Sequence, residues 1–142
     1  MPAPAFVQSS NQIDLSPRFV TTTTVVASPA AAAETIIASI TIPNLGDNPL
    51  ASGIDLSGWA AFTVGTSGTA ITLRIRQTNV AGTIVGNTGA LTGGIAAAAL
   101  VAQDVEGFDT APGVAVYVLT LQVTAGSAAS TVSAVKLRAE LV

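Results

Sequence analysis

From residue 34 onward, apolar residues recur at every second position or in short runs, and glycine, proline and asparagine interrupt these segments at short intervals. A period of two places successive side chains on opposite faces of an extended backbone. The clearest segment is 70–77, AITLRIRQ, in which the isoleucines and the leucine share one face and the arginines share the other. This pattern indicates an all-β domain whose strands bury one face.

We expect strands at residues 35–42, 59–64, 70–77, 82–86, 96–103, 113–124 and 131–141, with a weaker one at 19–26. Segment 96–103 is open between a strand and a buried helical turn, because its alanine run is also favourable for a helix. Trp59 follows a glycine at the start of a strand, so we interpret it as a core or inter-sheet anchor more than as a ligand platform. About eight short antiparallel strands predict a β-sandwich or jelly roll.

The first part of the chain has a different composition. Residues 1–33 hold four prolines, a run of four threonines and an alanine run, with little periodicity. We therefore divide the chain into an extended N-terminal arm, 1–33, and a jelly-roll β-sandwich, 34–142. Free termini are usually flexible. The alternative is an arm that lies against a neighbouring subunit, and we favour it, with Phe6 and Phe19 among its contacts.

The charge content is low. Charged residues make up 9% of the chain, against roughly 25% in an ordinary globular domain, while hydrophobic residues make up 49%. Either the surface consists of neutral threonine, serine and alanine side chains, or the faces of the protomer are covered by copies of itself or by a larger assembly. We favour the second explanation and expect a homo-oligomer.

The same composition argues against several classes of partner. The net charge is −3 and the five basic residues form no run, so we expect no nucleic-acid binding. The longest apolar run has eight residues, IAAAALVA, fewer than the ~20 that a membrane helix needs. The first residues show no basic and hydrophobic leader. We therefore expect no membrane contact, no signal peptide, and synthesis in the host cytoplasm.

The chain contains no histidine and no cysteine, which removes the usual bases, nucleophiles and soft metal ligands. Hydroxyl groups are abundant, but none has a histidine to activate it. The glycine-rich segment 82–94 lacks the lysine and hydroxyl residues of a phosphate-binding loop. We therefore predict a protein that is not an enzyme and that needs no cofactor.

The densest acidic cluster consists of Asp104, Glu106 and Asp109, in the sequence QDVEGFDT. We interpret it as a polar loop between strands. The weaker alternative is a calcium site, because carboxylates around a glycine supply the oxygen ligands that Ca²⁺ prefers, although the spacing does not match an EF-hand loop. Our main prediction is therefore that the chain has no metal site.

Basic residues recur on single strand faces. Arg74 and Arg76 share one face of their strand, as do Lys136, Arg138 and Glu140 of the last strand. These faces are either solvated or bonded to acidic residues of an adjacent subunit, for which the planar guanidinium group is well suited. We name the four basic residues as candidate contacts between subunits.

Two stretches carry a resemblance to a known group of proteins. They are SGWAAFTVGTSGTAITLRIRQTNVAGTIVG and EGFDTAPGVAVYVLTLQVTAGSAASTVSAVKLRAELV. The shared pattern is a TxRIR strand, a GxxVG hairpin, a PGxxxYxLxxQV strand and a final alternating strand. Over residues 34–142 the chain resembles small β-sandwich virion proteins of tailed bacteriophages.

The resemblance implies a jelly roll of the trimeric kind seen in tumour-necrosis-factor-like and C1q-like domains. It also implies a place in the virion, either as a capsid decoration or cement protein bound to the major capsid protein, or in a head or tail fibre. No collagen-like or coiled-coil stalk precedes the domain, so we expect capsid decoration. The alternative is a receptor- or carbohydrate-binding fibre module.

Overall fold

The computed structural model describes residues 18–23, 33–42, 53–65, 70–90, 96–110, 116–123 and 131–142. These residues form eight strands, and no helix occurs among them. The strands are β1 (Arg18–Thr23), β2 (Glu34–Thr41), β3 (Ile54–Thr63), β4 (Ile71–Gln77), β5 (Ile84–Asn87), β6 (Leu100–Asp109), β7 (Val116–Val123) and β8 (Thr131–Leu141).

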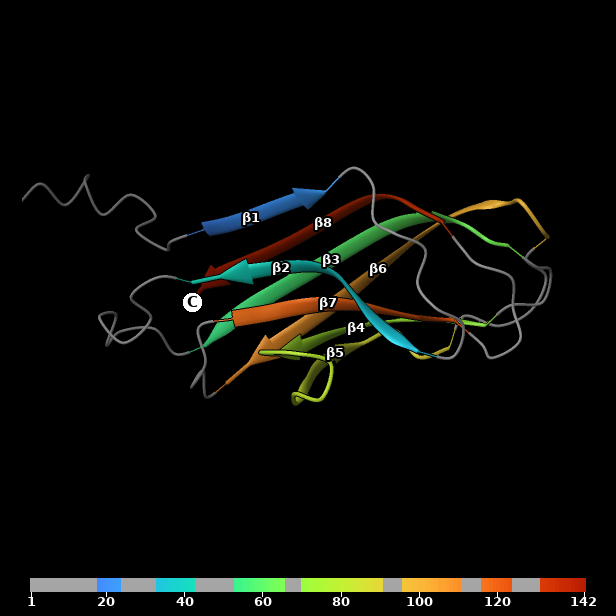
Figure 1. Cartoon of the computed structure of the whole chain (residues 1–142). Coiled ribbons are helices and arrows are strands. Elements are labelled where there is room, and N and C mark those ends of the chain that lie inside the picture. Colours follow the sequence, from blue (N-terminus) through green and yellow to red (C-terminus); the bar gives the residue numbers. More distant parts are fainter. Residues whose placement is uncertain are drawn as a thin grey trace, which may run out of the picture.

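The strands form one antiparallel sheet in the order β1-β8-β3-β6-β5-β4-β7-β2 (Figure 1). Their pairing is nested, because β4 pairs with β5, β3 with β6, β2 with β7 and β1 with β8. The chain is therefore one long antiparallel ribbon rolled into two four-stranded halves, β1-β8-β3-β6 and β5-β4-β7-β2. This is the strand order of a jelly roll. The predicted antiparallel eight-stranded jelly roll is confirmed.

The core lies between the two halves and follows the period-two alternation. Leu56 and Phe62 of β3, Leu73 of β4 and Leu119 of β7 are all fully buried. Each such side chain stabilises the fold by about 1.5–3 kcal/mol relative to an exposed one. The halves approach closely at Gly58, where a Cβ atom would lie 2.8 Å from Cδ1 of Leu119.

The two halves join at a narrow seam between β5 and β6. Within the described residues their pairing consists of one bridge, Gly86 with Gly107. A Cβ atom at Gly86 would lie 2.6 Å from the carbonyl oxygen of Glu106, and one at Gly107 would lie 2.8 Å from that of Val85. Because both contacts are with backbone atoms, only glycine fits on either side of this seam.

The alanine run before β6 forms a turn. The N–H of Ala99 donates to the carbonyl of Ala96 at 3.2 Å, and the N–H of Ala98 donates to the carbonyl of Val64 at 2.8 Å. Ala98 has a left-handed backbone with φ of 62°, which costs an L-residue roughly 1–2 kcal/mol. The segment that we left open between strand and helix is therefore a turn up to residue 99 and a strand from Leu100 onward.

Several strand boundaries differ from expectation. β3 begins at Ile54, five residues before the predicted start at 59, and β6 continues through the acidic cluster to Asp109. β1 lies where we expected the weaker strand at 19–26, within the segment 1–33 that we predicted as an arm, and it pairs with β8. Residues 1–17 and 24–32 of that segment lie outside the described residues, so the division of the chain into arm and sandwich stays a prediction.

We expect Gly107→Ala to lower the free energy of unfolding by about 1–3 kcal/mol, because the new methyl group must displace backbone at the seam. The exposed neighbour Glu106→Ala is the control, with an expected change within about 0.5 kcal/mol. Denaturant unfolding followed by circular dichroism measures both. Equal stability of the two variants would contradict the close approach of β5 and β6.

Candidate interaction surfaces

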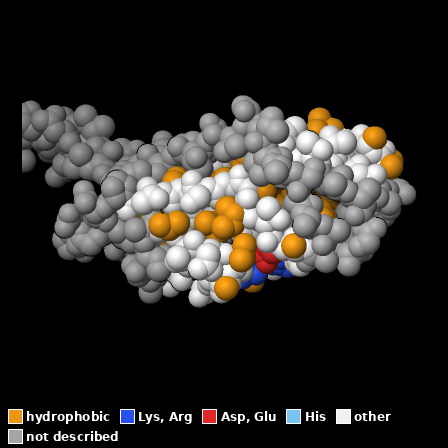
Figure 2. All heavy atoms as spheres, in the orientation of Figure 1, with side chains coloured by type: hydrophobic (Ala, Val, Ile, Leu, Met, Phe, Trp, Pro, Cys, Tyr) orange, Lys and Arg blue, Asp and Glu red, His pale blue; other side chains and the backbone are white. Residues whose placement is uncertain are grey.

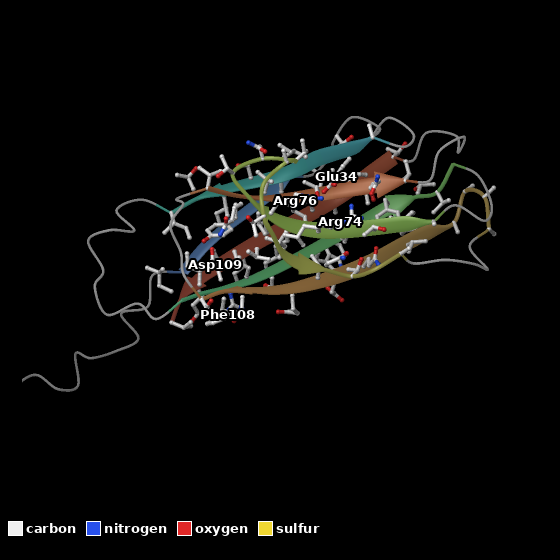
Figure 3. All side chains as sticks on the ribbon, turned by 90° about the horizontal axis from the view of Figure 1, so that it is seen from below. Glu34, Arg74, Arg76, Phe108 and Asp109 are labelled. Atoms are coloured by element: carbon white, nitrogen blue, oxygen red, sulfur yellow. The ribbon has the colours of Figure 1, made fainter. Side chains whose placement is uncertain are left out.

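The outer face of the β5-β4-β7-β2 half carries a charged group of side chains, which we call the Glu34 cluster. It consists of Glu34 on β2, Thr120 and Gln122 on β7, and Arg74 and Arg76 on β4. The strand register brings them together, since Glu34 lies opposite Gln122 and Arg74 lies opposite Thr120. Residues far apart in the sequence thus meet on three neighbouring strands (Figure 3).

Glu34 is the acceptor at the centre of this cluster. Arg76 donates two hydrogen bonds to its carboxylate, from Nε to Oε1 at 2.6 Å and from Nη2 to Oε2 at 2.8 Å. Nη1 of Arg74 lies 3.2 Å from Oε2, and the hydroxyl of Thr120 donates to Oε1. The remaining Arg76 nitrogen, Nη1, donates to the carbonyl of Gly82 at 2.9 Å. Such charge-assisted, bidentate pairs are stronger than neutral hydrogen bonds.

The electrostatic balance at Glu34 favours its ionised form. Burial by itself would raise the pKa of this carboxyl. The hydrogen bonds from Arg76 and Thr120, together with the charges of Arg76 and Arg74, outweigh burial and hold the pKa of Glu34 below its ordinary value. The same hydrogen bond raises the pKa of the Arg76 guanidinium. The cluster therefore stays charged over the whole neutral range.

The acid that binds Arg74 and Arg76 thus belongs to the same chain. From the sequence we considered a solvated face or an acid of an adjacent subunit, and the structure shows a third arrangement. Both guanidinium groups are largely covered, with 18% and 14% of their side-chain surface exposed. The sequence did not point to Glu34, because this residue precedes the predicted strand at 35–42. In the structure Glu34 pairs with Gln122 and is the first residue of β2. Contacts of these arginines with a further subunit stay a prediction.

The outer face of the other half carries the basic residues of β8. Arg138 forms an ion pair with Glu140, two residues along the same strand face. Lys136 is exposed and lies opposite Trp59 of β3, which in turn lies opposite Asp104 of β6.

On the face shown in Figure 2, charged side chains gather at one place, and the rest of the described surface is hydrophobic or uncharged.

Trp59 does not anchor the core, contrary to our expectation. It occupies an outward-facing position of β3 and is partly exposed, whereas its neighbours Gly58 and Ala60 are buried. The even-numbered residues of β3, among them Leu56, Ala60 and Phe62, face inward, so Trp59 faces outward.

The acidic residues 104, 106 and 109 lie in strand β6, where we had expected a loop. Asp104 and Glu106 are exposed on the outer face, whereas Asp109 is buried on the inner face. Figure 3 shows this alternation at the end of the strand, with Phe108 at the margin of the ribbon and Asp109 inside it. The three carboxylates are therefore not brought together as the calcium alternative requires. No group of three or more potential metal ligands occurs within the described ranges.

Asp109 belongs to a buried polar group that sequence reasoning missed. Its Oδ2 accepts hydrogen bonds from the hydroxyl of Tyr117 and from Nε2 of Gln77, both at 2.7 Å. Asp109 comes from one half of the sheet and its two donors come from the other, so this group ties the halves together. A signal was present in the sequence, because a tyrosine on a buried strand needs a partner for its hydroxyl. Burial, reinforced by Asp109, raises the pKa of Tyr117 far above its ordinary value.

Two further candidate contacts lie near the start of the chain. Phe6 lies outside the described residues. Phe19 lies in β1, opposite Ala139 of β8. In the part of the chain that the structure describes, no helix has the length and hydropathy needed to span a membrane.

Comparisons with known proteins identify the fold. No protein-family model matches the sequence, and no curated protein matches it significantly. Among solved structures, a chain of the VP2 subviral particle of infectious bursal disease virus aligns with 90% of this chain and 33% of its own length, with 13% identity and a TM-score of 0.57. A chain from the Gx strain of the same virus aligns with 88% of this chain and 32% of its own, with 15% identity and a TM-score of 0.54. This protein therefore spans about a third of the length of these viral chains, and at this level of identity the likeness concerns the fold.

We expect Glu34→Gln to lower the free energy of unfolding at neutral pH by about 2 kcal/mol, because both arginines lose their charged partner. A carboxyl whose native pKa is lowered stabilises the fold above its unfolded pKa of 4.5, and this stabilisation is lost as the pH falls through the native pKa. The difference in the free energy of unfolding between wild type and variant should therefore shrink as the pH falls below 4.5. Denaturant unfolding over a pH series measures it, with the exposed Glu106→Gln as control. A difference in the free energy of unfolding that is the same at all pH values would contradict the ion pairs of Glu34.

We expect the hydroxyl of Tyr117 to stay protonated in alkali as long as the protein is folded. The chain has one tyrosine, so its phenolate absorbance reports this residue alone. In denaturant it should titrate at about pH 10. Because the pKa of Tyr117 is higher in the folded than in the unfolded protein, this group contributes fully to the stability of the fold below about pH 10. The contribution is lost as the pH rises through the native pKa. Phenolate absorbance near pH 10 with intact circular dichroism would refute the burial of this group.

Proposed function

We propose that this chain is a structural protein of a virus particle and acts without catalysis. The observation that carries the proposal is the jelly-roll fold, in which nine-tenths of the chain aligns with a chain of the VP2 subviral particle of infectious bursal disease virus. The composition supports it independently. A chain without histidine or cysteine, and with 9% charged residues, has few groups for chemistry and a surface suited to contact with other subunits.

The way in which charge is used supports the same role. Glu34 with its two arginines, and Arg138 with Glu140, form ion pairs within the chain. The Glu34 cluster links β2, β7 and β4, the other ion pair lies within β8, and each of these charged side chains has a partner of opposite charge in the same chain. Covering such a surface with a neighbouring subunit removes little unpaired charge from water, which keeps the desolvation cost of assembly low.

Within that role we propose a decoration or cement protein of a tailed bacteriophage, present as a homotrimer on the shell of a major capsid protein. The sequence motifs over residues 34–142 support this finer proposal. A subunit that binds only the assembled shell stabilises it by mass action, and many weak contacts add through avidity. The residues that precede β1 would reach a neighbouring subunit, since 17 residues of extended chain span up to roughly 60 Å.

The test is to locate the chain in virus particles. Antibodies against the purified protein should label the heads of particles made by cells that express it. Stepwise guanidinium chloride should release the chain before the shell opens, and sedimentation of the released protein should give three chain masses. Particles that lack the chain would overturn the structural role. Label on fibres would move it to the fibre alternative.

Removal of residues 1–17 tests the arm and leaves β1 in place. We expect rebinding to stripped particles to weaken at least tenfold, while the β-sheet circular dichroism stays unchanged. Full rebinding of the shortened protein would exclude a role of these residues in attachment.

A further inference from the structure

The two arginines of the Glu34 cluster differ in how fully they are bonded. All three side-chain nitrogens of Arg76 donate hydrogen bonds, two of them to Glu34 and one to the carbonyl of Gly82. Arg74 uses only Nη1, which donates to Glu34 at 3.2 Å and to Gln122 at 2.8 Å. The Nε and Nη2 atoms of Arg74 have no acceptor among the described residues, and neither atom is buried. Two donors of this guanidinium group can therefore be reached from outside the chain.

Within the described part of the chain, the strands on either side of Arg74 supply no acceptor for these two nitrogens. Thr120, opposite Arg74 on β7, donates its hydroxyl to Glu34. Asn87, opposite Arg74 on β5, accepts a hydrogen bond from the N–H of Gly89 at 3.0 Å. The single carboxylate of Glu34 also balances only one of the two arginine charges. A planar group with excess positive charge and two donors side by side suits a second carboxylate.

An exposed carboxylate lies on the outer face of the other half. Asp104 of β6 is exposed and forms no ion pair with the described residues. It lies opposite Trp59 of β3, whose side chain is partly exposed on the same face. Lys136 of β8 lies on the other side of Trp59, so a cation approaches the indole most favourably from the side of Asp104. A guanidinium group can bind a carboxylate there and stack on the neighbouring ring.

We propose that Arg74 of one copy binds Asp104 of the next copy and packs against the Trp59 side chain of that copy. The proposal rests on the self-assembly in the proposed function, and it names the surfaces that meet. Nε and Nη2 of Arg74 donate to the two carboxylate oxygens of Asp104, while Nη1 keeps its bonds to Glu34 and Gln122 of its own chain. The contact therefore leaves the Glu34 cluster intact.

This contact uses two different surfaces of each copy. Arg74 lies on β4, and the accepting residues lie on β6 and β3. Because β4 and β6 lie on the two sides of the short strand β5, the donating and accepting surfaces are adjacent but distinct. A head-to-tail contact of this kind closes into a ring when the rotation between copies allows it. A ring of three such contacts gives the proposed homotrimer.

The charges of the two surfaces favour this pairing over contact between identical surfaces. The Glu34 cluster has two basic residues and one acid. The outward-facing charged residues of β3, β6 and β8 are four acids and two bases, namely Asp55, Asp104, Glu106, Glu140, Lys136 and Arg138. Unlike surfaces attract each other and like surfaces repel, so charge complementarity selects the head-to-tail arrangement.

Two neutral variants on one strand face test the contact. Asp104→Asn removes the proposed partner of Arg74 and should weaken self-association about tenfold or more in sedimentation equilibrium. Glu106→Gln is the matched control, because Glu106 is also exposed on the outer face of β6 and forms no ion pair with the described residues. It should change self-association by less than about twofold. The circular dichroism of both variants should equal that of the wild type.

Arg74→Gln completes a double-mutant cycle. Glu34 keeps its two hydrogen bonds from Arg76 in this variant, so the fold is retained. When Arg74 is already replaced, Asp104→Asn should weaken self-association no further. Trp59, the one tryptophan of the chain, gives an independent signal. Its fluorescence emission should shift to longer wavelength when the wild-type assembly dissociates on dilution, because the indole then becomes exposed to water.

The outcomes separate this contact from the proposed function. Equal self-association of the Asp104→Asn and Glu106→Gln proteins, or additive effects of Asp104→Asn and Arg74→Gln, would overturn the contact and leave a homo-oligomer of another geometry. A wild-type protein that stays monomeric at high concentration, or that saturates at two chain masses, would overturn the ring. Label on the heads of virus particles would still support the structural role in either case.

Discussion

Apolar packing between the two halves of the rolled sheet holds this molecule together, and its polar groups are arranged around that packing. Tyr117, Phe62 and Leu119 fill the space between the halves. In the described residues, polar contacts between the halves lie at one end of the sandwich. They are the Gly86–Gly107 bridge and the hydrogen bonds that Asp109 accepts. The core supplies the cohesion, while these polar contacts fix how the halves meet.

Charge is scarce in this chain, and three of its charged side chains, Glu34, Arg74 and Arg76, form ion pairs between strands of one half. One carboxylate, Glu34 of β2, binds two arginines of β4, and Thr120 of β7, the strand between β2 and β4, is an additional donor. One carboxylate can bind all of these donors because period-two alternation places their side chains on one face. Lys136, Asp104 and Glu106 stay exposed on the other half, so the two outer faces differ in the charge that they present to a neighbouring molecule.

The strands were predictable because their apolar residues alternate, and all eight occur near their expected positions. What failed was the interpretation of residues that interrupt this pattern. We placed Gly58 before the predicted strand at 59–64, yet it lies inside β3, where its missing side chain makes room for Leu119. Asp104 and Glu106 suggested a loop, although their spacing of two already fits one strand face.

The candidate sites were harder to predict for a different reason. Which acid meets Arg76, and which donor meets Asp109, depends on the register of strands that are distant in the sequence, and no local pattern encodes it. A single sequence can show that a charged side chain shares a face with others. It does not show whether the opposite charge comes from the same chain.

The position of β8 has a consequence for how the protein is made. This strand is the last of the eight in sequence, yet it lies between β1 and β3. During synthesis the ribosome releases it after all other strands, and until then β1 lacks its neighbour and β3 is paired along one side. Long-range pairing of this kind is slow. The growing polypeptide therefore exposes a gap in its sheet throughout translation, and chaperones that shield extended segments would find their substrate there.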